Sequence, residues 1–255
     1  YDGNGFLQWV VIIFMFLSGA NIALYYFLLV QRKGALWKSG EFRCYLTVTL
    51  ICAGLICLDL MTHGTFSEEG VAYSFRQALF QVVSVMTTTG FASADYNMWP
   101  VFSVFLLFLL FFSGGCQGST SGAIKISRWL LLFKNGFAEL QSVLHPKAVR
   151  RVRINGRPVS AEMVDHITQF FAFYMLFFFF GALALSACGL PFLEAISASA
   201  TAIGNVGPGL GAVGPASNFA LLPMAGKIIM TLLMLFGRLE IFTVLVLFLP
   251  SFWKK

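Results

Sequence analysis

The stretch from Val82 to Ser93, VVSVMTTTGFAS, sets three threonines and a glycine inside a strongly apolar sequence. Gly90 permits backbone angles that turn several carbonyl oxygens to one side, and a ring of such carbonyls can replace the hydration shell of K⁺. This break is therefore predicted to bind a dehydrated monovalent cation. The alternative interpretation is a threonine–glycine cap at the end of a surface helix.

A second break of the same kind follows 117 residues later. Aligning Ala78–Phe91, ALFQVVSVMTTTGF, with Ala195–Pro208, AISASATAIGNVGP, places Gly90 opposite Gly207. Few residues are identical, but in both stretches an extended segment follows a helix rich in small residues. The recurrence predicts an internal repeat and disfavours a simple helix cap at both places.

A third polar stretch, Phe112–Arg128 (FSGGCQGSTSGAIKISR), interrupts an apolar segment that runs from Val101 to Phe133. That segment is far longer than the ~20 residues that a membrane-spanning helix needs, so we expect the helix to be broken in its middle. Its glycines and serines predict a flexible polar loop at membrane depth, below a pore. Close helix packing through the glycines is the alternative, and the two roles can coexist.

The same stretch does not fit nucleotide-binding or hydrolase motifs. A phosphate-binding loop needs lysine directly after glycine, but Lys125 lies three residues past Gly122, and a nucleophile elbow needs serine where Thr120 stands. The five cysteines and three histidines form no metal-ligating or catalytic pattern, and we interpret the cysteines as buried free thiols. We therefore predict no catalytic residue, no cofactor other than a transported ion, and no enzyme.

Membrane helices must hold these breaks. With 58% hydrophobic and 11% charged residues and a mean hydropathy of +0.81, the chain differs from soluble domains, in which about 25% of residues are charged. Apolar segments recur to the last residues, so we expect no removable targeting segment. The segments long enough to span are Phe6–Val30, Tyr45–Met61, Val101–Phe133, Val164–Cys188 and Ala225–Leu249. Two shorter ones, Phe75–Met86 and Phe192–Ile203, have the length of re-entrant helices.

Positive charge predicts the orientation. The linkers Gln31–Arg43 and Lys134–Arg157 are rich in lysine and arginine and are expected to be cytoplasmic, as is the C-terminus. The linkers His63–Pro100 and Gly189–Met224, which hold the short helices, are nearly free of basic residues and are expected outside. Both short helices then enter from one face, as parallel repeats, whereas inverted repeats would place them on opposite faces. The predicted fold class is an all-α membrane protein with parallel repeats of helix, re-entrant pore helix, filter loop and helix.

The second basic linker has its own local pattern. It begins as an interfacial helix, and Asn155–Gly156 is typical of a type I′ turn between two short basic strands. We interpret this linker as a solvated anchor that faces lipid. The net charge of +6 then follows from membrane topology, and no nucleic-acid partner is predicted.

Four stretches resemble a known family: VVSVMTTTGF, GGCQGSTSGAIKI, NVGPGLG and FGRLEIFTVLVLFLPSFW. In this order they are similar to the third and fourth repeats of the Trk/Ktr/HKT superfamily of potassium transporters, most of all to the bacterial Trk membrane subunit. The likeness covers nearly the whole chain. In that family four repeats surround one pore, each repeat gives one strand to a K⁺ filter, and a loop inside the third repeat's second helix gates the cavity below. The resemblance thus implies a potassium-channel-like pore-loop architecture.

The resemblance also implies roles for single residues. It implies a third filter strand of Thr87, Thr88, Thr89, Gly90 and Phe91, a fourth of Gly204, Asn205, Val206, Gly207 and Pro208, and K⁺ at Thr88, Thr89, Asn205 and Val206. The gating residues that it implies are Gly114, Gly115, Gly118, Ser119, Thr120, Ser121, Gly122, Lys125 and Arg238. Independently of the resemblance, Arg238 and Glu240 are charged residues within an apolar helix. Placing such charges inside a membrane costs free energy, so they indicate function, unless they lie near enough to the inner end of the helix to snorkel or to pair.

By the same resemblance, residues 1–33 are the second helix of repeat two. Residues 34–159 are repeat three, with the filter at 87–91 and the gating loop at 113–125, and residues 160–255 are repeat four, with the filter at 204–208. The chain is therefore expected to be the C-terminal half of a four-repeat pore whose N-terminal repeats are missing. The implied partners are membrane lipid, a second copy in a homodimer and a cytosolic nucleotide-binding regulatory subunit.

Together these features predict uptake of potassium ions across the inner (plasma) membrane through a filter of backbone carbonyls. The glycine- and serine-rich loop is expected to gate this path, and Arg238 to repel a resting cation and help to hold the loop shut. Two alternatives stay open. One is a symporter that couples K⁺ to Na⁺ or H⁺. The other is a C-terminal fragment that does not conduct, because two filter strands cannot close a ring of four.

Overall fold

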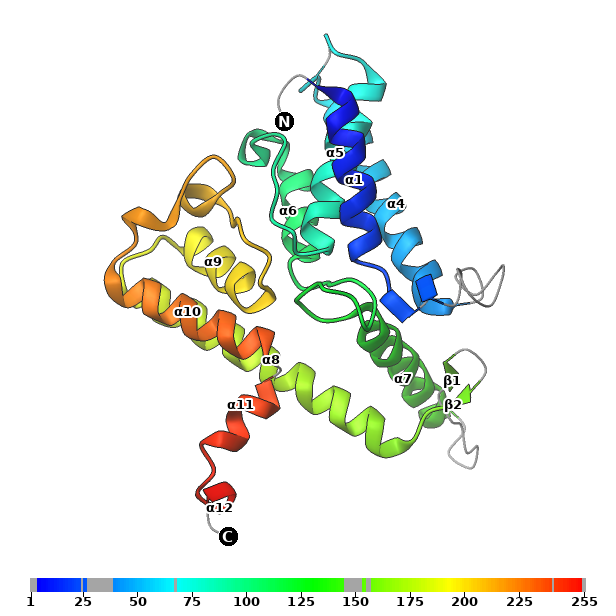
Figure 1. The fold of residues 1–255 in the computed structure, drawn as a ribbon, viewed down its shortest axis with the longest axis vertical. Coiled ribbons are helices and arrows are strands. Elements are labelled where there is room, and N and C mark those ends of the chain that lie inside the picture. Colours follow the sequence, from blue (N-terminus) through cyan, green and yellow to red (C-terminus); the bar gives the residue numbers. More distant parts are fainter. Residues whose placement is uncertain are drawn as a thin grey trace.

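The computed structural model describes residues 4–23, 25–26, 39–66, 68–144, 153–154, 157–239 and 241–253. Helices dominate this part of the chain (Figure 1). They are α1 (Gly5–Ser18), α4 (Gly40–Thr62), α5 (Val71–Met86), α6 (Val101–Leu110), α7 (Ile126–Leu144), α8 (Ala161–Ala187), α9 (Phe192–Gly204), α10 (Met224–Arg238), α11 (Ile241–Leu247) and α12 (Pro250–Trp253). Short 3₁₀ turns lie at Tyr96–Met98, Gly211–Val213 and Phe219–Leu221.

The helices form two groups, with the segment that joins α6 to α7 lying between them (Figure 1). In one group, α5 packs against α1, α4 and α6; in the other, α9 packs against α8 and α10. Both α5 and α9 are short helices enclosed by longer ones, and nearly every residue in the C-terminal half of each is buried. This arrangement confirms the predicted repeat of a long helix, a short enclosed helix, an extended segment and a further helix.

Among the described residues, two helices, α4 and α8, are long and apolar enough to cross a membrane, and α10 with α11 makes a third span if this bent pair is counted as one. They match the segments predicted from Tyr45 to Met61 and from Val164 to Cys188. The predicted interruption of the longest apolar segment is also confirmed, because α6 ends at Leu110 and α7 begins at Ile126.

The first predicted span is wrong as a continuous helix. Rather than running from Phe6 to Val30, α1 ends at Ser18, and the chain turns at Gly19. A Cβ atom on Gly19 would lie 2.5 Å from the Tyr45 hydroxyl oxygen and 2.6 Å from Cγ2 of Thr87. The chain therefore turns where two side chains from other helices leave room only for glycine.

The last predicted span, from Ala225 to Leu249, is also divided. α10 ends at Arg238, and α11 begins at Ile241 at an angle of 110° to it. The end of α10 is held against α9, because a Cβ atom on Gly237 would lie 1.8 Å from the Ile203 carbonyl oxygen. α11 contacts α8 rather than α9, and with α12 it extends away from the two groups of helices (Figure 1).

The predicted pair of short basic strands is present. β1 (Arg153–Ile154) and β2 (Arg157–Pro158) are antiparallel, with Arg153 opposite Pro158. The turn residues predicted between them, 155–156, lie outside the described residues, as does the predicted functional Glu240. The Lys134 ammonium donates a hydrogen bond of 2.9 Å to the Arg153 carbonyl oxygen, which joins α7 to this hairpin.

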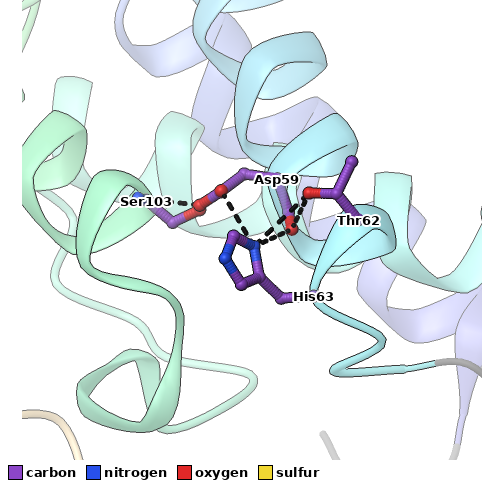
Figure 2. A network of polar contacts seen from close by, with 4 residues as sticks. All are labelled: Asp59, Thr62, His63 and Ser103. Atoms are coloured by element: carbon purple, nitrogen blue, oxygen red, sulfur yellow. Dashed lines mark hydrogen bonds and ion pairs between the residues drawn. The ribbon is translucent and has the colours of Figure 1, made fainter.

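A carboxylate on α4 caps the N-terminus of α6 (Figure 2). Oδ2 of Asp59 accepts hydrogen bonds from the backbone N–H of Ser103 at 3.1 Å and from its hydroxyl at 2.6 Å. Pro100, the residue at the N-cap position of α6, provides no side-chain acceptor of its own. Since the first N–H groups of a helix lack partners within it, Asp59 supplies from a neighbouring helix what the local sequence does not.

We therefore predict that Asp59→Ala destabilises the protein by about 1 kcal/mol, the usual contribution of an N-cap side chain. Thermal unfolding in detergent, followed by circular dichroism, measures the change. His63→Ala is the control, because His63 lies 3.3 Å from the same carboxylate but its side chain is 62% exposed and does not touch α6. Equal melting temperatures for the Asp59→Ala and His63→Ala variants would contradict the role of the cap.

Candidate functional site

Two segments, 87–91 after α5 and 204–208 at the end of α9, have residues with positive φ at matched positions. Thr88 has a φ of +52° and Asn205 a φ of +53°; Gly90 has +78° and Gly207 +119°. The two pairs are related by the spacing of 117 residues seen in the sequence alignment. Positive φ at a threonine or an asparagine is unusual and costs energy, so its recurrence at matched positions shows that both segments require this shape.

The hydrogen bonds that hold the two segments are matched as well. The N–H of Thr89 donates to the carbonyl of Ser84 at 2.9 Å, and the N–H of Val206 donates to the carbonyl of Thr201 at 3.0 Å. Ser84 and Thr201 are themselves equivalent at the spacing of 117 residues. Each segment therefore begins by folding back on the last turn of the short helix that precedes it.

The same two residues also hold carbonyl oxygens with their hydroxyl groups. Ser84 donates to the carbonyl of Phe91 at 2.5 Å, and Thr201 to the carbonyl of Gly207 at 2.9 Å. The carbonyl oxygens of Thr88, Thr89, Asn205 and Val206 accept no hydrogen bond within the described part of the chain. They are free to bind a ligand that prefers neutral oxygen donors.

The two segments face each other across a short distance. A Cβ atom on Gly90 would lie 2.7 Å from the Val206 carbonyl oxygen and 3.4 Å from Cδ of Pro208. A Cβ atom on Gly207 would lie 3.3 Å from Cα of Gly90. Glycine is needed at position 90 both for its positive φ and because a side chain would displace the carbonyl of Val206.

The polar loop, residues 113–125, is folded on itself. The N–H of Gly114 donates to the carbonyl of Ile124 at 2.8 Å, and the N–H of Gly115 donates to the Ser121 hydroxyl at 2.8 Å. The Lys125 ammonium donates to the hydroxyl of Ser121 at 3.0 Å and to its carbonyl oxygen. The two ends of the loop therefore lie side by side, and the lysine amine is enclosed by oxygen atoms of the loop itself.

This loop contacts both extended segments. The N–H of Gly122 donates to the Thr88 hydroxyl at 2.7 Å, and the N–H of Ala123 donates to the carbonyl of Gly204 at 2.9 Å. A Cβ atom on Gly122 would lie 2.3 Å from the Gly204 carbonyl oxygen, so only glycine permits this approach. The loop therefore lies against the ends of α5 and α9, where the two extended segments begin.

Neighbouring elements hold the other side of the polar loop. The N–H of Cys116 donates to the carbonyl of Gly19 at 2.8 Å, which joins the loop to the turn after α1. Arg238, the last residue of α10, donates from Nη1 to the carbonyl of Thr120 at 3.0 Å. Arg238 therefore contacts this loop, although 118 residues separate it from Thr120.

The structure brings the residues of both proposed filter segments and of the loop into one cluster. Within it Thr87, Val206 and Ser121 are buried, whereas Phe91 is 43% exposed. All five cysteines are free thiols, and no group of three or more His, Cys, Asp or Glu side chains in the described ranges could hold a metal ion. The cluster offers neutral backbone and hydroxyl oxygens rather than a charged metal site.

Sequence reasoning missed two contributors to this cluster. Gly19 follows Ser18 in a run of small and polar residues, Ser18–Asn21, which is a detectable interruption in an apolar segment. Glu41 binds the backbone N–H of Gln117 through Oε1 at 2.5 Å. Its only signal in the sequence is that it is the one acidic residue of a basic linker.

Comparison with known proteins agrees with this geometry. The family model TrkH, described as a cation transport protein, matches residues 1–255. The Trk system potassium uptake protein TrkH of Salmonella typhimurium is 39% identical over 256 residues, covering 100% of this chain and 52% of that protein. The Trk system potassium uptake protein TrkI of Halomonas elongata is 39% identical over 253 residues, covering 98% of this chain and 50% of that protein.

A solved structure is similar over the same range. The crystal structure of the potassium transporter TrkH from Vibrio parahaemolyticus superposes with a TM-score of 0.92 at 36% identity, covering 100% of this chain and 54% of that one. The chain therefore spans about half the length of the relatives that it matches. From the family match and the shared fold, we conclude that this chain belongs to the TrkH family of cation transport proteins.

Proposed function

We propose that this chain provides half of a K⁺-selective pore through which potassium ions cross the membrane. One observation carries the proposal. Two extended segments with matched backbone angles lie against each other, and their carbonyl oxygens at Thr88, Thr89, Asn205 and Val206 are left without hydrogen bonds in the described chain. Such oxygens can replace the hydration shell of K⁺.

In this mechanism K⁺ loses water at the outer mouth and passes between the carbonyl oxygens of the two segments. α5 and α9 end where the segments begin, so the negative ends of their helix dipoles face the ion and favour it by roughly 0.3–1 kcal/mol each. The hydroxyl groups of Ser84 and Thr201 keep the flanking carbonyls of each segment in place.

Two segments do not close a ring around an ion. The relatives are about twice as long as this chain, and their additional length has room for two more repeats. We propose that residues 34–159 and 160–255 are repeats three and four of such a pore, and that residues 1–33 end repeat two. On this view the inner membrane holds the complete protein with its C-terminus in the cytoplasm. A second copy and a cytosolic nucleotide-binding subunit are its partners.

The polar loop is proposed as the gate. It closes the path below the two segments through the bonds from Gly122 to Thr88 and from Ala123 to Gly204. Arg238 holds the loop at Thr120 and places a positive charge beside the path, which repels a resting cation. Opening then requires the loop to leave these contacts.

For the filter, we predict that Gly90→Ser lowers the selectivity for K⁺ over Na⁺ by roughly tenfold, the effect of ~1.4 kcal/mol at one ion site. A side chain at this position displaces the Val206 carbonyl and meets a φ of +78°. The test compares Rb⁺ and Na⁺ uptake in a four-repeat transporter that carries this chain as its C-terminal half. Gly54→Ser is the matched control, because no atom lies within 4 Å of a Cβ at Gly54. Unchanged selectivity in folded Gly90→Ser protein would argue against the filter.

For the gate, we predict that deleting residues 118–122 raises basal K⁺ flux by at least tenfold, since the closed state loses a charged hydrogen bond worth about 1.5–3 kcal/mol together with a second contact. The deletion removes the bonds to Thr88 and to Arg238 together. Rb⁺ efflux from proteoliposomes measures the flux, and size-exclusion chromatography shows whether the protein is folded. Lost or unaltered flux in folded protein contradicts the gate. Flux that requires Na⁺ or H⁺ indicates the symporter instead.

For the arginine, we predict that Arg238→Ala raises basal flux in the same direction by roughly tenfold, because a hydrogen bond from a charged donor contributes about 1.5–3 kcal/mol. The same efflux assay applies. Lys227→Ala is the control on the same helix, since Lys227 donates to the carbonyl of Ala220 at 2.9 Å and does not contact the loop. Normal, regulated flux in the Arg238→Ala protein leaves Arg238 with a structural role only.

A further inference from the structure

Glu41, in the first turn of α4, binds the polar loop from α4, whereas Arg238 binds it from α10. Oε1 of its carboxylate accepts a hydrogen bond of 2.5 Å from the N–H of Gln117, 76 residues away. The hydroxyl and the backbone N–H of Ser127 also donate to this carboxylate. Ser127 is the second residue of α7, so one carboxylate joins the middle of the loop to the beginning of the helix that follows it.

An acidic residue in a first helical turn often does no more than stabilise its own helix, by about 0.3–1 kcal/mol. Here that task has another contributor, because the Ser39 hydroxyl accepts from the N–H of Phe42 and caps α4. Glu41 instead is half-buried and reaches across to the loop and to α7. The beginning of α7 lies beside the N-terminal end of α4, and the two helices are in contact (Figure 1).

The charged residues around the loop indicate what the negative charge of Glu41 does at this contact. Lys125, inside the loop, is repelled by Arg238 and Arg128 and attracted by Glu41. Arg238 nevertheless bonds to the loop at Thr120, only a few residues from Lys125 in sequence. Because like charges are held close together, a nearby opposite charge offsets part of their repulsion. The carboxylate of Glu41 does so from α4.

We propose that Glu41 is a positioning residue for the gate: it fastens the polar loop in its closed position and couples the loop to α4 and α7. The proposal rests on the proposed function of the loop as the gate. In the closed state the carboxylate keeps Gln117 and Ser127 together and compensates Lys125. Without it, the loop loses its contact with α4, and the repulsion between Lys125 and Arg238 is unbalanced.

The loop carries its own reporter for a test. Cys116, next to Gln117, has 0% exposure, so its reaction with a membrane-impermeant maleimide measures how often the loop opens. The assay uses the four-repeat transporter with the remaining cysteines replaced by alanine. In that protein we expect Glu41→Ala to raise both the rate of Cys116 modification and basal Rb⁺ efflux by roughly tenfold, the effect of losing one charged hydrogen bond.

Two further variants make the result specific. Glu41→Gln keeps an oxygen that can accept from Gln117 but removes the charge, so we expect a smaller increase; it also carries the test if the alanine variant does not fold. Glu139→Ala is the matched control, because Glu139 lies exposed on α7 and bonds only to Ser142 of its own helix. Modification of Cys116 in this variant is expected to stay at the parent rate. Unchanged modification and efflux in both Glu41 variants would overturn the proposal.

Combination with the loop deletion separates this proposal from the gate itself. When residues 118–122 are absent, adding Glu41→Ala is expected to raise efflux no further, because both changes release the same contact. A further, additive increase means that Glu41 acts elsewhere and overturns the proposal. If the deletion alone raises efflux and Glu41→Ala does not, the gate stands and the role of Glu41 is wrong. If the deletion alone has no effect, the gate is wrong, whatever Glu41 does.

Discussion

Backbone groups at membrane depth need partners, and this requirement governs the whole site. Helices satisfy their own amides, but the segments after α5 and α9 leave the helix where lipid offers no hydrogen bonds. The structure satisfies part of that backbone with hydroxyl groups at matched places, Ser84 in one repeat and Thr201 in the other. The carbonyls that remain unpaired lie on two segments that face each other. An ion that replaces water by neutral oxygens is the partner that completes such a site.

The same requirement makes the loop and the extended segments depend on each other. The loop satisfies the N–H groups of Gly122 and Ala123 with a hydroxyl and a carbonyl at the base of the two segments. The Gly204 carbonyl accepts its hydrogen bond from the loop. It also lies so close to Gly122 that a Cβ atom at position 122 would clash with it. Moving the loop therefore leaves polar groups at the base of the path without partners until water enters. In the proposed mechanism, wetting of the path therefore accompanies movement of the loop.

The parts of the fold that follow from local composition were predictable, and the parts that depend on distant contacts were not. Apolar length predicts α4 and α8, and glycine-rich polar stretches predict the breaks after Met86, Leu110 and Gly204. The turn at Gly19 depends on the Tyr45 hydroxyl and on Thr87, which lie on other helices. In the sequence, Glu41 looks like any acidic residue in the first turn of a helix. Its contact with the N–H of Gln117 exists only in the folded structure. Its role follows from tertiary geometry, which one-dimensional patterns do not contain.

The two repeated units agree at the extended segments but differ below them, and in the proposed mechanism this difference sets where control acts. In the first unit the helix after the extended segment stops at Leu110 and gives way to the loop. In the second unit the corresponding α10 continues to Arg238, with Gly237 packed directly on the Ile203 carbonyl. In the proposed gate, the contacts of this loop, those with Arg238 of α10 and Glu41 of α4 among them, determine the energy required to open it.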